Sequence, residues 1–163
     1  MNHILAVLKL ASKFGDKKDV RQFVNHVQAF EKTIIATDGH VAIRITSDSF
    51  QEHKTQYTIE SIEKAAKVDC LSLLECLEPE SFIHFPPVDK IFRPQERHTI
   101  ESATFDVKYI LKIAQALEAF RKDLKLPKAR LTINPLSSDS ANLMSMVIDD
   151  IKIEVILMPL KSK

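Results

Sequence analysis

The sequence is poor in the residues that break or crosslink a chain. Among its 163 residues there are two glycines, two cysteines and no tryptophan. The spacing of Cys70 and Cys76 suits neither a disulfide framework nor a zinc site. No other histidine or cysteine pattern has the spacing of metal ligands. We therefore expect reduced thiols, no metal, no cofactor and a cytoplasmic location.

Long apolar runs and a charge of one sign are also missing. No run approaches the ~18 residues of a membrane span, and residues 1–10 lack the features of a secretion signal. The net charge of +1 means that any basic surface is local. With 45% apolar and 28% charged residues, the chain is typical of one soluble folded domain.

The first half of the chain is expected to be one helix followed by strands. Apolar residues at helical spacing predict a helix over 2–14, and 20–30 is expected to be a strand. Residues 33–36 and 41–46 are expected to form a hairpin, 56–59 a short strand, and 61–77 a second helical stretch. Four of the seven prolines lie in 78–94, which indicates an extended connector.

The second half repeats this order. A strand is expected over 99–105, and Asp106 is a candidate N-cap for a helix that ends near Leu124. Strands are expected over 129–134, 143–148 and 152–158, with turns at 137–140 and 149–150. The two helices align at an offset of 106 residues.

These observations predict an α+β fold made of a duplicated α-β-β-β unit, with two helices packed on an antiparallel sheet. We expect one domain over 1–163. Its half-repeats would span about 1–60 and 98–163, joined by a helical, proline-rich connector at 61–97.

The segment Ala36-Thr37-Asp38-Gly39-His40 is the most informative in the chain. Asp-Gly between two strands favours a tight hairpin, because glycine accepts φ > 0 and aspartate bonds its own backbone. The turn would present threonine, aspartate and histidine side chains together. A solvent-exposed turn histidine is the ordinary alternative.

Three separated segments resemble the bacterial DNA polymerase III beta sliding clamp. They are the ATDGH turn with the preceding Asp19-Val20-Arg21 and Asn25, Phe85-Pro86 with Ile91-Phe92, and the C-terminal part. In that part, 105–111 resembles the last clamp helix, and 156–161 its terminal strand. The resemblance implies a clamp-like domain. Clamps are rings of six domains that slide on DNA as processivity factors and hold polymerases through short peptides.

The resemblance also implies a hydrophobic peptide-binding pocket. Its residues here would be Val24, Thr37, Gly39, His40, Val41, Ala42, Pro86, Ile91, Ile156, Leu157, Met158, Pro159 and Leu160. Apolar walls with a few polar anchors suit a short peptide that carries leucine and phenylalanine. Val41 and Ala42 replace an arginine and a leucine of the family. A clamp has three domains and this chain has room for one, so the pocket residues meet within one chain, between two chains, or not at all.

Basic residues on two helices are candidates for contact with double-stranded DNA: Lys9, Lys13, Lys108, Lys112, Arg121 and Lys122. A solvated helix face is the commoner role for such residues. The sequence has no glycine-rich phosphate loop, nucleophile elbow or His-Glu-x-x-His motif, so we expect no catalytic residue and no enzyme.

The leading expectation is a replication or repair accessory protein, in which copies of the chain form a homo-oligomeric ring and the pocket binds clamp-interaction peptides of a DNA polymerase or other partner. The alternative is a monomeric module, of phage or mobile-element origin, that competes with a host clamp for its partners. A third is a remote relative without the pocket.

Overall fold

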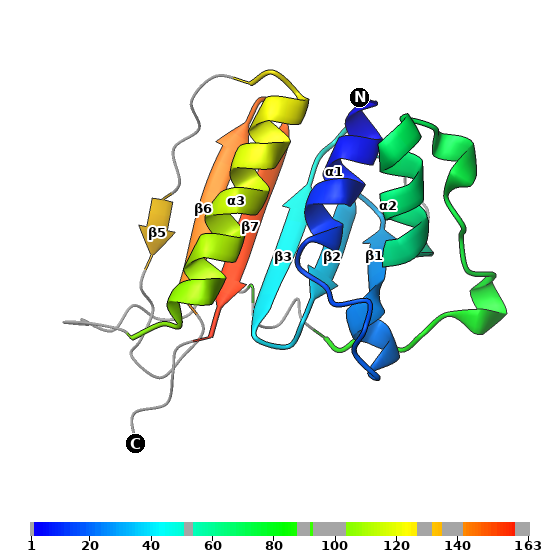
Figure 1. The fold of residues 1–163 in the computed structure, drawn as a ribbon, viewed down its shortest axis with the longest axis horizontal. Helices are drawn as coiled ribbons and strands as arrows, with labels where there is room; N and C mark the ends of the chain where they lie inside the picture. Colours follow the sequence, from blue (N-terminus) through cyan, green and yellow to red (C-terminus); the bar gives the residue numbers. More distant parts are fainter. Residues whose placement is uncertain are drawn as a thin grey trace.

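The computed structural model describes residues 2–50, 54–87, 92, 104–126, 132–134 and 142–158. The chain folds into a seven-stranded antiparallel sheet with three helices on one face (Figure 1). The helices are α1 (His3–Ser12), α2 (Ile59–Val68) and α3 (Val107–Asp123). The strands are β1 (His26–Phe30), β2 (Thr33–Thr37), β3 (Val41–Thr46), β4 (Thr55–Thr58), β5 (Thr132–Asn134), β6 (Asn142–Ile148) and β7 (Ile151–Leu157).

The strand order, β4-β1-β2-β3-β7-β6-β5, confirms the duplicated α-β-β-β unit. Helix α1 is followed by β1, β2 and β3, and helix α3 by β5, β6 and β7. The two units meet where β3 pairs with β7, from Val41 opposite Leu157 to Thr46 opposite Lys152. The core is therefore continuous from one unit to the other. The third helix, α2, packs beside α1 and adds Ile59 and Ile62 to the same core.

Alternation along the strands divides the sheet into two faces. Ile43, Val155 and Leu157 point toward the helices and lie in the main core with Phe14 and Phe120. The opposite, outer face carries a smaller apolar cluster. Its buried members are Ile35, Ala42, Phe92 and Ile156.

Helices α1 and α3 each begin directly after a residue whose side chain caps the helix. The Asp106 carboxylate accepts the N–H of Lys108 at 2.9 Å, so the predicted N-cap of α3 is confirmed. Asn2 caps α1 in the same way, by accepting the N–H of Ile4. The hairpin strands β2 and β3 are also confirmed, as is the turn at 149–150.

The expectation of one strand over 20–30 is wrong in its first half. Gln22–Asn25 is a 3₁₀ turn, and β1 begins only at His26. The Asp16 and Asp19 carboxylates accept the N–H groups of Lys18 and Arg21 at 2.9 and 2.8 Å. These local bonds favour turns over a strand, because an aspartate side chain competes with the sheet for backbone donors.

The helix expected over 61–77 is also wrong in its extent. It ends at Val68, because Asp69 adopts a left-handed conformation with φ 53°. Cys70 then lies in the following loop. The backbone of Cys76 forms an isolated antiparallel β-bridge with Tyr57 of β4. The strand expected over 99–105 is absent at Thr104 and Phe105; its first residues, like the turn at 137–140, lie outside the described part.

Candidate functional site

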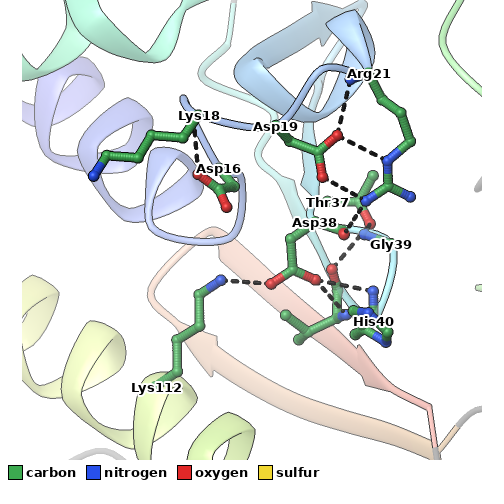
Figure 2. Close-up of polar contacts among 10 residues, drawn as sticks. Asp16, Lys18, Asp19, Arg21, Thr37, Asp38, Gly39, His40 and Lys112 are labelled. Atoms are coloured by element: carbon green, nitrogen blue, oxygen red, sulfur yellow. Dashed lines mark hydrogen bonds and ion pairs between the residues drawn. The ribbon is translucent and has the colours of Figure 1, made fainter.

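The β2–β3 turn has a dense set of local hydrogen bonds (Figure 2). Asp38 Oδ1 accepts the N–H groups of His40 and Val41, both at 2.9 Å. Thr37 Oγ1 accepts the N–H of Gly39 at 3.0 Å and donates to the carbonyl of Val41 at 2.9 Å. These bonds hold the turn in one shape, with His40 exposed at its end.

Arg21 holds the turn from the side of the 3₁₀ turn. Its guanidinium binds both carboxylate oxygens of Asp19 and donates to the carbonyl of Asp38 at 3.1 Å. The Arg21 hydrogen bonds lower the pKa of Asp19 to about 2. A Cβ atom on Gly39 would lie 2.8 Å from Arg21 Nη1, and Gly39 has φ +90°. Glycine is therefore favoured at this position mainly by the backbone conformation, because the flexible end of Arg21 could move aside.

Helix α3 holds the turn from the other side. Lys112 Nζ lies 2.6 Å from Asp38 Oδ2. The His40 ring stacks on Tyr109, with centroids 5.4 Å apart and planes inclined by 27°. Lys108 Nζ lies 4.7 Å from the centre of the same Tyr109 ring. The first turns of α3 thus fix the position of the hairpin turn.

The end of β7 completes this region. The N–H of Met158 donates to the carbonyl oxygen of His40 at 3.1 Å. Val41 is paired with Leu157, and Ala42 with Ile156. The turn and the C-terminal strand, which are more than 100 residues apart in the sequence, therefore meet within one chain. Met158 is 43% exposed beside this junction.

The sheet separates the other predicted pocket residues. Val41 and Leu157 are fully buried on the helix side, whereas Ala42 and Ile156 are covered on the outer face. Val24 is buried in the 3₁₀ turn, outside the strands. The Val41–Leu157 and Ala42–Ile156 pairs both adjoin the junction, but their side chains lie on opposite sides of the sheet. Thr37 is also buried, and its hydroxyl is occupied by its two hydrogen bonds within the turn. Ile91, Pro159 and Leu160 lie outside the described residues.

Pro86 lies in a groove of about 560 Å³ on the outer face, away from the turn. The Gln56 side chain fixes this part of the connector, because its amide exchanges two hydrogen bonds of 2.8 Å with the backbone of Ile83. Gln56 is 1% exposed. The sequence interpretation missed this role, although a glutamine inside a short strand is a usable signal. The groove is also lined by Phe30, Phe82 and Phe85.

Five of the six basic residues proposed to face DNA contact a carboxylate. Lys9 binds Asp123 at 2.7 Å, and Lys112 binds Asp38. The remaining pairs are Lys108–Asp106, Arg121–Glu118 and Lys122–Glu118. The Arg121 hydrogen bond lowers the pKa of Glu118 to about 2. Lys13 has no ion pair within 4 Å among the described residues.

The described part of the chain has neither a cluster of metal ligands nor a helix that could cross a membrane. No cluster of three or more His, Cys, Asp or Glu side chains in that part is arranged to hold a metal ion. None of the helices α1, α2 and α3 combines the length and the apolar character that crossing a membrane requires.

The sequence matches no protein-family model and no curated protein. The fold is similar to two crystal structures from Pseudomonas aeruginosa, a DNA polymerase sliding clamp with ligand and the DNA polymerase III subunit beta. Each comparison has a TM-score of 0.65 and 13% sequence identity and covers 97% of this chain.

The matched region covers 64% and 65% of those two proteins, which is less than two thirds of their length. They are structures of the protein that the three sequence motifs resemble. At 13% identity the similarity concerns the fold, not the activity. The chain therefore has an α+β fold similar to that of the DNA polymerase sliding clamps.

Proposed function

We propose that this chain is a non-enzymatic, clamp-like module that binds a short peptide where the β2–β3 turn meets the end of β7. One observation carries the proposal, the hydrogen bond from the N–H of Met158 to the carbonyl of His40. It joins two of the segments that resemble the clamp pocket. Because both segments belong to one chain, the site needs no second subunit.

The exposed groups at the junction suit an apolar peptide with polar anchors. Met158 can adapt its unbranched side chain to different ligands. His40 offers a ring nitrogen, and Val41 and Leu157 support the surface from below. Burying ~2 large peptide side chains yields about 3–6 kcal/mol before ordering costs, which indicates micromolar affinity.

The partner that we propose is a clamp-interaction peptide of a DNA polymerase or another replication or repair protein. Titration with a fluorescent Gln-Leu-x-Leu-Phe peptide tests this proposal. Substitution His40→Ala or Met158→Ala should weaken binding, whereas His84→Ala, a matched exposed histidine on the connector, should not. No binding at ~100 μM, or equal binding by His40→Ala, would contradict the proposal.

The assembly state separates a ring from a monomeric module. A ring of clamp size would need about six copies in head-to-tail contact. The junction within one chain favours the second candidate, a monomer that competes with a clamp for its peptides. Light scattering on a sizing column decides between them: a mass near 18.5 kDa at all concentrations supports the monomer, and a mass near six chains supports the ring.

Contact with double-stranded DNA stays a separate proposal. Most of the candidate basic residues form ion pairs with carboxylates. We therefore expect the affinity for DNA to be low and to fall steeply as the salt concentration rises. Lys13→Glu should reduce that binding and its salt dependence. Binding that salt does not change would exclude a phosphate-tracking surface.

A further inference from the structure

Helix α3 has two apolar faces, and the described residues cover only one of them. Ile113, Leu117 and Phe120 are buried against the sheet. On the other side, Val107 is 76% exposed and Leu111 55% exposed. Ile110, at 38%, continues the same stripe. Three large aliphatic side chains at this spacing form a contiguous exposed patch, which is typical of an interaction surface.

A basic groove runs beside this stripe, between α1 and α3. It has a volume of about 460 Å³, and none of the described residues that line it is acidic. Its cations are Lys13, directly after α1, and Lys108 and Lys112 from α3. The rest of the lining is Leu111, Gln115, Ala116 and Ala119. The two alanines keep the groove open, because a larger side chain at either position would occupy it.

The carboxylates that meet these lysines do not lie in the groove. Lys112 contacts Asp38 of the hairpin turn, and Lys108 contacts Asp106 before the helix begins. Lys13 has no carboxylate within 4 Å in the described part of the chain. The groove therefore has Lys13, with no carboxylate within 4 Å among the described residues, and two lysines that are paired outside it, around an apolar floor and next to exposed leucine and valine side chains.

We propose that the groove between α1 and α3 binds an acidic protein segment that also carries bulky aliphatic residues. Its carboxylates would contact Lys13, Lys108 and Lys112, and its aliphatic side chains would cover Leu111 and Val107. Charge complementarity selects the acidic residues, and the exposed stripe selects the apolar ones. A DNA duplex satisfies the lysines alone, because its phosphates leave the aliphatic stripe against a polar backbone.

The test uses the full chain and a fluorescein-labelled peptide, Glu-Asp-Leu-Leu-Glu-Asp-Leu-Leu-Glu-Asp. We expect micromolar binding, and about a tenfold loss of affinity on Leu111→Ser or Lys13→Gln. Val147→Ser on β6 is the matched control for the apolar substitution, because Val147 is 68% exposed. Lys64→Gln on α2 is the matched control for the lysine substitution, because Lys64 is an exposed lysine paired with Glu60.

The same peptide with alanine in place of leucine separates charge from apolar contact. It should bind at least about tenfold more weakly. Equal binding of the two peptides, or no effect of Leu111→Ser, would overturn the proposal in favour of a purely electrostatic surface. Anionic vesicles or a short DNA duplex that lost affinity on Leu111→Ser, while the peptide did not, would also overturn it.

Discussion

Lys112 and Asp38 join the two halves of the chain through an ion pair of 2.6 Å across 74 positions (Figure 2). The two carboxylate oxygens of Asp38 have different tasks. Oδ1 accepts the N–H groups of His40 and Val41 and shapes the turn, while Oδ2 contacts α3. The position of α3 and the shape of the turn are therefore linked through one side chain.

Replacing Lys112 should weaken both stability and peptide binding at the turn. In Lys112→Met the Asp38 carboxylate, whose side chain is 12% exposed, loses its only ammonium partner among the described residues. We expect a loss of roughly 1 kcal/mol in the free energy of unfolding, measured by urea denaturation. Lys64→Met, which breaks an exposed i,i+4 pair with Glu60, should change stability by much less. Equal losses of stability in the two variants would show that the Lys112–Asp38 pair contributes no more than an exposed surface pair.

Both glycines should resist substitution, for different reasons. At Gly39 the cost is mainly conformational, because φ is +90° and the nearest contact is the flexible end of Arg21. At Gly15 it is steric, because a Cβ would lie 2.5 Å from the backbone oxygen of Val24 and 2.4 Å from Ile59 Cδ1. Each alanine variant should lower stability by roughly 1–3 kcal/mol, seen as a lower Tm.

A second substitution separates the two causes. In an Arg21→Ala background the Gly39→Ala loss should persist, because removing the side chain does not relieve the backbone strain. In an Ile59→Ala background the Gly15→Ala loss should fall only partly, because the Val24 carbonyl remains. A Gly39→Ala variant as stable as the parent would contradict the left-handed turn.

The Arg44–Glu154 pair on the outer face should also be important for stability. Glu154 is 4% exposed, and Arg44 Nη2 lies 2.8 Å from its Oε2. Arg44→Met should cost roughly 3 kcal/mol, because it removes the closest guanidinium from a buried carboxylate. Lys152→Met should cost less, because the Lys152 side chain, whose Nζ lies 2.8 Å from Glu154 Oε1, is 52% exposed.

The double variant Arg44→Met/Glu154→Met provides the control for this pair. It should recover most of the loss, since two apolar side chains leave no buried charge. Urea denaturation with an unchanged m-value would show that stability, rather than the unfolded state, has changed. A double variant as unstable as Arg44→Met would contradict a role for the carboxylate.

Tyr57 should give the protein an alkaline limit. Burial, with Cys76 adding to the effect, raises the pKa of Tyr57 from 10.0 to about 12. The folded state thus holds the phenol proton more tightly than the unfolded state. The resulting stability is fully present below pH 10 and is lost as the pH rises through about 12. In a Tyr109→Phe chain, which leaves one tyrosine, tyrosinate absorbance should have its midpoint near 12 when folded.

The unfolded chain is the control for that titration. In guanidinium chloride the midpoint should return to about 10, the value of a free tyrosine. A folded chain that already ionises near pH 10 would contradict the burial of Tyr57. Tyr57→Phe should remove the loss of stability between pH 10 and 12.

Elements with a strong local signal were predicted well. The hairpin at 33–46 follows from alternation and from Asp38-Gly39, and α3 from its apolar spacing and the Asp106 cap. The strand predicted over 20–30 is confirmed from His26 onward, but its first half is a 3₁₀ turn rather than part of the sheet. The carboxylates of Asp16 and Asp19 accept backbone N–H groups of the same segment, in competition with strand pairing. The spacing of apolar residues does not reveal that competition.

The site was predicted as a set of residues, but not as an arrangement. Alternation already puts Val41 and Ala42 on opposite faces of a strand, yet the sequence interpretation placed both in one pocket. The structure buries Val41 under the helices and Ala42 on the outer face. The ion pair of Lys112 with Asp38 and the stacking of His40 on Tyr109 had no sequence signal, because they depend on where α3 lies.

By itself, the sequence determined the local structure: the turn at Gly39, the cap at Asp106, the two α-β-β-β units and the segments that resemble a sliding clamp. These depend on backbone conformation and spacing, which neighbouring residues control. Only the tertiary structure decided that β3 pairs with β7 and thereby brings Met158 to His40. That contact requires two distant segments to share one sheet, which is set by burial of the common core rather than by any local preference.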